Sequence, residues 1–255
     1  MFLFDLKVDS VLNLFAIPSW STLITADCAR DIPIAVADTY VASQTAGQLG
    51  NLSNYLPTDY KYQENNKAST VTTGVLSTAL KINHQKPTAD VVACASYTEL
   101  ILTSQNPYVI GTQLRHTADG KNVMSIDTIA ATTGALSFNA AKTLGYIEKE
   151  DWSPLDASKQ STRAVLQAAG SVYLDMWSSA STYSAVPWGT PCERVEGSSL
   201  NSPCTNGAPK GGSTNRNSMR RYVIDESLGS VDIHCAFRLW AVWRIVMSFG
   251  WRGRS

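Results

Sequence analysis

Hydrophobic residues recur at helical spacing in two segments of the chain. Residues 31–47 carry an apolar side that includes Tyr40, and Asp31 is placed to cap the first turn. Residues 156–178 show the clearest helical period, with Tyr173 on the apolar side. The pattern predicts a helix over each segment, and each helix needs a partner element to cover its apolar side.

Alternation of apolar and polar residues, rich in β-branched side chains, indicates strands elsewhere. The three longest alternating stretches, separated by turn residues, are 89–103, 108–116 and 122–132. We interpret them as an antiparallel meander. A short strand is predicted at 60–66, and a hairpin around Gly229 is predicted to join 220–226 to 230–237.

The segments between these elements are predicted to be connections. Residues 138–151 form a second helical connection, and the turn-rich residues 192–217 form a long loop. Residues 238–255 hold three tryptophans and four arginines and fit no strand pattern.

The order helix, linker, glutamate occurs twice. Tyr40 precedes Glu64 by 24 residues, and Tyr173 precedes Glu196 by 23. Such a repeat is typical of a duplicated supersecondary unit, although two copies can share a spacing by coincidence. We therefore divide the chain into a degraded signal segment, a first half, a second half and an atypical tail, at 1–26, 27–150, 151–237 and 238–255.

Composition describes a globular protein of low charge. Apolar residues make up 44% of the chain and charged residues 16%, and 21 basic side chains balance 21 acidic ones. Nothing in this balance favours a nucleic acid or an anionic membrane as partner. No run reaches the roughly 20 apolar residues of a membrane-spanning helix.

Five cysteines show neither a Cys-x-x-Cys motif nor zinc spacing with histidine, so no metal site is expected. Cys192 and Cys204 flank a loop that a disulfide can close. Cys28, just before the first helix, and Cys94, in a strand-like run, form a second candidate pair. Buried free thiols are the alternative for both pairs.

The amino-terminal residues indicate the cellular compartment in which the protein is found. Its apolar run follows Asp5, Lys7 and Asp9, which is a degraded form of a secretory signal. A glycosylation sequon at Asn51 fits the same compartment. We expect a protein of the secretory pathway.

Several motifs together resemble a protein family. They are Tyr-Gln-Glu-Asn-Asn at 62–66, Cys-Ala-Ser-Tyr-Thr-Glu-Leu at 94–100, Tyr-Val-Ile-Gly-Thr-Gln at 108–113, Val-Pro-Trp-Gly-Thr-Pro-Cys-Glu-Arg-Val-Glu-Gly at 186–197 and Arg-Arg-Tyr-Val-Ile-Asp-Glu at 220–226. The chain resembles fungal proteins of the ketosteroid-isomerase-like (SnoaL/NTF2-like) class from residue 27 to about 237. More narrowly, it is similar to the secretory dimerising cyclases of maleidride biosynthesis. After Phe237 the closing strands of that family are lost.

The resemblance implies an α+β protein of two tandem NTF2-like halves, each a helix packed on a curved antiparallel sheet that forms a cone. It also implies a cofactor-free cyclase or isomerase of secondary metabolism, which joins maleic-anhydride-type monomers through an enolate-like intermediate. Such chemistry needs an apolar cavity, a base and donors near the developing oxyanion. The alternative is a secreted binding or accessory protein that keeps the cone without a base.

Five residues are candidates for the acid or base. Glu64 and Glu196 occupy matching places in the two repeats, and Asp127 lies in an alternating strand. His84 and His116 can exchange protons near neutral pH. The alternative for the glutamates is a hydrogen bond that ties strand to helix, and for the histidines a capped or exposed position.

Four residues are candidates for substrate binding. Arg194 can hold a carbonyl or carboxylate with two hydrogen bonds, or pair with Glu196 instead. Tyr62, Tyr97 and Trp188 are suited to line an aromatic pocket, with a place in the core as the alternative. The expected partner is a small apolar molecule, and a homodimer is one open oligomeric state.

Overall fold

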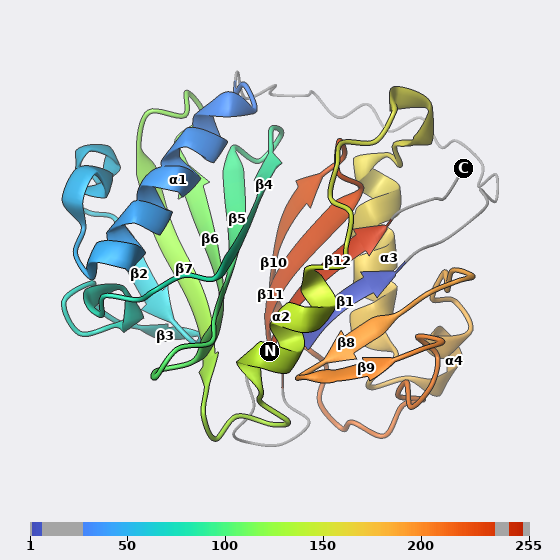
Figure 1. Cartoon of the computed structure of the whole chain (residues 1–255). Coiled ribbons are helices and arrows are strands. Elements are labelled where there is room, and N and C mark those ends of the chain that lie inside the picture. The colour runs from blue at the N-terminus through green and yellow to red at the C-terminus, as the bar shows by residue number, and fades with distance from the viewer. Residues whose placement is uncertain (1, 7–27, 238–244, 252–255) are drawn as a thin grey trace.

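The protein, for which we have a computed structural model, is described over residues 2–6, 28–237 and 245–251, and its strands form two six-stranded sheets (Figure 1). The first sheet has the order β3 (Lys67–Ala68), β2 (Lys61–Glu64), β7 (Val123–Thr132), β6 (Tyr108–His116), β5 (Ala95–Leu102) and β4 (His84–Asp90). The second has the order β10 (Ser218–Asp225), β11 (Ser230–Ala236), β12 (Ile245–Trp251), β1 (Phe2–Leu6), β8 (Arg194–Glu196) and β9 (Ser199–Asn201).

Helices α1 (Asp31–Ala46) and α3 (Arg163–Asp175) cover the outer faces of the two sheets, whereas α2 (Ala140–Ile147) packs in a cluster with residues of both sheets. The chain also forms helix α4 (Ala180–Tyr183) and the 3-10 turns η1 (Gly50–Tyr55), η2 (Val75–Ser77) and η3 (Ala157–Lys159). Figure 1 shows α1 across the first sheet and α3 along the second, with the other faces of the sheets turned toward each other. Tyr40 of α1 and Tyr173 of α3 belong to the two apolar cores that form under these helices.

The α+β class and the antiparallel meander are confirmed, because β4, β5, β6 and β7 pair antiparallel in sequence order. The predicted strand 89–103 is wrong in one respect, since a turn divides it. The side chain of Asp90 accepts hydrogen bonds from the backbone N–H groups of Val92 and Ala93, which turns the chain between β4 and β5. The tandem pairing of two equivalent halves stays a prediction.

Element boundaries differ from the sequence prediction at three places. Asp31 lies inside the first turn of α1, and Arg30 takes the cap position. The helix predicted at 156–178 begins only at Arg163, because Gln160 and Thr162 are extended. The predicted loop 192–217 contains the β8–β9 hairpin.

The hairpin that follows each candidate glutamate has a matching turn. Glu64 is followed by Asn65 and Asn66, both with positive φ, and β2 returns as β3. Glu196 is followed by Gly197, with φ of 63°, and β8 returns as β9. Asparagine and glycine tolerate this backbone region, so both tight turns are encoded locally.

Both predicted disulfides are confirmed. Cys28 is bonded to Cys94, which ties the segment before α1 to the β4–β5 turn. Cys192 is bonded to Cys204 and closes the loop around β8 and β9. Cys235 carries the free thiol of the described residues and is buried. Signal segment 1–26 lies outside the described residues except for β1, and the tail 238–255 is described only at β12. The expectation that the tail fits no strand is wrong for β12, which pairs with β11 and β1.

No helix within the described ranges combines the length and the apolar composition that spanning a membrane requires.

Candidate functional site

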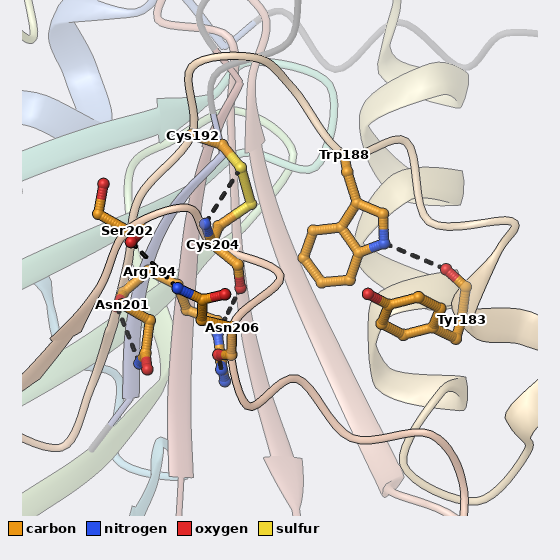
Figure 2. Close-up of a disulfide and its surroundings, with 8 residues drawn as sticks. All are labelled: Tyr183, Trp188, Cys192, Arg194, Asn201, Ser202, Cys204 and Asn206. Atoms are coloured by element: carbon orange, nitrogen blue, oxygen red, sulfur yellow. Dashed lines mark hydrogen bonds between the residues drawn. A yellow bond between two sulfur atoms is a disulfide. The ribbon is translucent and has the colours of Figure 1, made fainter.

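Glu196 lies at the end of β8, and a buried arginine of the same strand holds its carboxylate. Arg194 donates from Nη1 to Oε2 of Glu196. Its Nε donates to the carbonyl of Cys204 at 3.0 Å, and its Nη2 donates to the carbonyl of Asn206 at 2.6 Å. Figure 2 shows Arg194 under the loop that the Cys192–Cys204 disulfide closes.

The electrostatics of this pair suit a proton acceptor. Burial raises the pKa of the Glu196 carboxyl above its usual value, and Arg194 offsets part of the rise. The Glu196 side chain keeps 21% of its surface exposed, and Arg194 keeps 1%. Glu196 is therefore oriented on one side and accessible on the other.

Aromatic side chains extend from this pair toward the surface. Tyr173 is fully buried, and burial raises the pKa of its phenol, with smaller effects from Arg194 and Glu196. The rings of Tyr173 and Trp188 meet edge to face at 6.1 Å. Trp188 donates from its indole to the carbonyl of Tyr183 at 3.2 Å (Figure 2). The structure thus brings Glu196 and Arg194 into direct contact, and Trp188 is linked to them through Tyr173, which was not among the predicted site residues.

Glu64, like Glu196, is partly buried, but it accepts two hydrogen bonds from its own half of the chain. Its Oε2 accepts hydrogen bonds from the Tyr62 hydroxyl at 3.1 Å and from the backbone N–H of Val75 at 2.7 Å. A Cβ on Gly74 would lie 2.6 Å from the same oxygen, so the chain packs directly over the carboxylate. Burial raises the pKa of the phenols of Tyr62 and Tyr40, and the charge of Glu64 adds to it.

Asp127 faces the second sheet and not the core under α1. Arg221 donates to its Oδ2, and Nδ1 of His234 lies 3.1 Å from the same oxygen. Burial opposes ionisation, but His234 and Arg221 hold the pKa of the Asp127 carboxyl well below its usual range. Tyr97 is fully buried here, with its ring edge-on to His234 at 5.9 Å.

Sequence reasoning missed His234, which is fully buried and whose pKa burial lowers, while Asp127 opposes that effect. The available signal was its place in the alternating stretch 230–237, at a spacing that puts it on the same strand face as Asp232.

The other two histidines lie apart from Glu196, in the first sheet. His84 of β4 has Nε2 3.8 Å from Oε1 of Glu99, and burial lowers the pKa of the imidazole. His116 ends β6, and burial lowers its pKa to about 4. No group of three histidine, cysteine or acidic side chains in the described part of the chain is arranged to hold a metal ion.

Asp232, which lies between the two sheets, is expected to make the free energy of unfolding depend on pH. It is fully buried, accepts a hydrogen bond from the Thr88 hydroxyl at 2.7 Å, and burial raises the pKa of its carboxyl to about 8. Lys86 opposes this rise, and Glu99 and Asp225 add to it. Between pH 4 and 8 the carboxyl is protonated in the folded chain and ionised in the unfolded chain. Its contribution to stability is therefore fully present below pH 4 and is lost as the pH rises to 8.

We expect Asp232→Asn to remove this loss, because the amide stays neutral. The difference in unfolding free energy between wild type and variant should change by up to about 1.4 kcal/mol per pH unit in that window. Urea denaturation at pH 5, 6, 7 and 8 measures it, with the exposed Asp59→Asn as control. Parallel stability curves for wild type and Asp232→Asn would contradict the assignment.

Comparison with known proteins gives a partial family match and two distant structural likenesses. Residues 159–244 match a family model described as a domain of unknown function, DUF8021. An NTF2-like protein of unknown function from Shewanella baltica OS155 is 12% identical, with a TM-score of 0.30, over 40% of this chain and 92% of its own. AclR, a proposed hydroxylase from Streptomyces galilaeus, is 12% identical, with a TM-score of 0.29, over 55% of this chain and 95% of its own.

No curated protein matches the chain. The span matched by the family model contains α3, the β8–β9 hairpin and the β10–β11 hairpin, so it includes Glu196 and Arg194.

Proposed function

We propose that the protein is a cofactor-free cyclase or isomerase that acts on a small apolar molecule, with Glu196 as its general base. The observation that carries the proposal is the state of this carboxylate. Arg194 fixes one oxygen, burial raises the pKa, and part of the side chain stays open to solvent. A base whose pKa lies closer to neutral transfers protons more effectively at cellular pH.

The proposed reaction removes a proton from a carbon beside a carbonyl group of the substrate. The electron pair of the broken C–H bond moves into the carbonyl to form an enolate, and the proton goes to Glu196. The enolate carbon then attacks an electrophilic carbon of a C=C bond in a second molecule; the π bond breaks, and its electron pair takes the proton back from Glu196. In an isomerisation the enolate instead takes that proton at another carbon. Trp188 and Tyr183 would contact the apolar part of the substrate.

The narrower proposal for the substrate rests on the sequence resemblance. It is the dimerisation of maleic-anhydride-type polyketide monomers in the secretory pathway, without a metal or redox cofactor. We would incubate the folded protein with a carboxylated alkyl maleic anhydride and follow dimers by mass spectrometry. Protein-dependent dimers support the proposal. Product traces identical to those of a protein-free control would overturn this substrate, and absence of exchange into D₂O at an activated C–H would overturn the base.

The second candidate is a non-catalytic binding or accessory protein. It is favoured because polar side chains that could bind or activate a substrate already form hydrogen bonds within the protein. Glu64 accepts hydrogen bonds from Tyr62 and Val75, and three nitrogens of Arg194 donate within the protein. Ligand binding without turnover, unchanged in Glu196→Gln, would establish this candidate.

Passage through the secretory pathway predicts a glycan on Asn51. Asn51 and Ser53 of the sequon are exposed in η1, while Leu52 between them is buried. The two disulfides fit the same oxidising compartment. Protein secreted from a eukaryotic host should lose mass on treatment with an N-glycosidase, and Asn51→Gln should not. The exposed Asn54→Gln is the matched control, and an unglycosylated secreted chain would contradict the prediction.

A further inference from the structure

Two arginines cross between the sheets in a reciprocal way. Arg30, directly before α1, donates to Oδ2 of Asp225 at the end of β10. Arg163, the first residue of α3, donates to Oδ1 of Asp90 at the end of β4, at 2.5 Å. Each helix on one sheet therefore begins with an arginine that binds the last residue of an edge strand of the other sheet.

The two aspartates also bind the opposite edge strands through backbone groups. Oδ2 of Asp225 accepts from the N–H of Ala89 in β4 at 2.9 Å, and Oδ2 of Asp90 accepts from the N–H of Ile224 in β10 at 2.9 Å. In each case the donor is the residue just before the opposite aspartate. Asp90 is fully buried and Asp225 is 1% exposed, so both carboxylates are satisfied inside the protein.

Equivalent residues follow Arg30 and Arg163 at the same sequence spacing. Ten residues after Arg30 and Arg163 come Tyr40 and Tyr173, each in the core under its helix. Four residues further, the carbonyl of Gln44 in α1 and that of Trp177, two residues after the end of α3, each accept from a loop residue that lies 36 positions later. These bonds join Leu80 N–H to Gln44 O at 3.2 Å and Ser213 N–H to Trp177 O at 3.0 Å.

The strand hairpins agree as well. β4 pairs with β5 from Asp90 to Ala95, and β10 pairs with β11 from Asp225 to Ser230, across turns of equal length. Helix, loop, glutamate hairpin and strand hairpin thus follow one order in both parts of the chain. Matching contacts in both directions between the parts are the signature of a two-fold interface.

We propose that the protein is an internal pseudodimer, in which residues 28–150 and 151–237 dock through the facing surfaces of their sheets. The partner that this surface fits is the other half of the same chain. The crossed pairs Arg30–Asp225 and Arg163–Asp90 set the alignment of the two halves, because a charge buried in a shifted register would lose its partner. The proposal is independent of the catalytic role of Glu196.

Polar residues outside the candidate site form hydrogen bonds between the two halves of the proposed pseudodimer. Gln113 donates from Nε2 to the carbonyls of Arg221 and Asp232, at 3.0 and 3.2 Å. Arg115 donates to the carbonyl of Tyr222 at 2.7 Å. Together with Asp127 and its partner Arg221, these contacts join β6 and β7 to β10 and β11. They belong to the interface between the halves.

Hydrogen exchange in the full chain tests the crossed arrangement. Arg30→Ala removes a first-half side chain, so exchange should accelerate in second-half peptides over 221–228 as well as at Ala89. Arg163→Ala should accelerate exchange in first-half peptides over 86–93 as well as at Ile224. We expect about tenfold faster exchange for these amides, because each variant leaves a buried carboxylate without the charge of its partly exposed arginine.

Arg220→Ala is the matched control, because Arg220 pairs with Asp175 at 2.6 Å within the second half. It should accelerate exchange only in that half. Arg163→Lys keeps the charge but loses the guanidinium N–H that donates to Oδ1 of Asp90. It should give the same pattern at smaller size if the alanine variant is poorly folded. Acceleration confined to the half that carries each substitution would overturn the proposal.

Discussion

Glu196→Gln is expected to lower the turnover of the proposed cyclase or isomerase by about 10²- to 10⁴-fold, the usual range for loss of a general base. Glutamine keeps an oxygen for the hydrogen bond from Arg194, so the fold should persist. The variant loses the lone pair that accepts the substrate proton. Rates from the product assay, or from isotope exchange into the substrate, measure the change.

The matched control is Glu64→Gln, because Glu64 ends the equivalent hairpin strand and its oxygen is already bonded to Tyr62 and Val75. It should change turnover less than about tenfold, since it removes no proton acceptor from the proposed site. The raised pKa of Glu196 also predicts that activity rises with pH through an acidic limb above pH 4.5, which the variant lacks. Equal turnover in wild type and Glu196→Gln would remove Glu196 as the base.

Arg194→Leu is expected to destabilise the protein by about 3–5 kcal/mol, because it leaves a half-buried carboxylate and two carbonyls without their donor. Urea denaturation at neutral pH measures the loss. Arg216→Leu, an exposed arginine in the same loop region, should change the free energy of unfolding by less than about 0.5 kcal/mol.

The double variant Arg194→Leu/Glu196→Gln should recover part of that stability, because the unpaired charge is gone. Strictly additive effects of the two substitutions would show that the pair is not coupled, and Arg194 would then stabilise the loop only through Cys204 and Asn206.

The sequence predicted more of the local structure than of the contacts. Both disulfides, the helix around Tyr40 and the meander after Glu64 follow from cysteine placement, helical spacing and alternation. The turn at Asp90 was missed, since an aspartate within an alternating stretch turns the chain only when its carboxylate reaches the next N–H groups. The β8–β9 hairpin was missed because its strands span only three residues each.

The sequence predicted which residue types form the candidate site, but not which side chains contact them. Spacing singled out Glu64 and Glu196 as a matching pair, yet it did not distinguish their surroundings. Tyr62 and Val75 donate hydrogen bonds to Glu64, whereas Arg194 donates to Glu196. Asp127 was placed correctly in a strand, but its partner His234 comes from a strand more than a hundred residues later.

The sequence by itself determined the two long helices, most of the meander strands and the disulfide candidates, because helix period, strand alternation and cysteine positions act over a few neighbouring residues. Only the tertiary structure decided which side chains meet. Burial, which raises the pKa of Glu196 and lowers that of His234, and the crossing of Arg30 and Arg163 depend on how two sheets face each other. Such contacts join positions far apart in the chain, where no local periodicity records them.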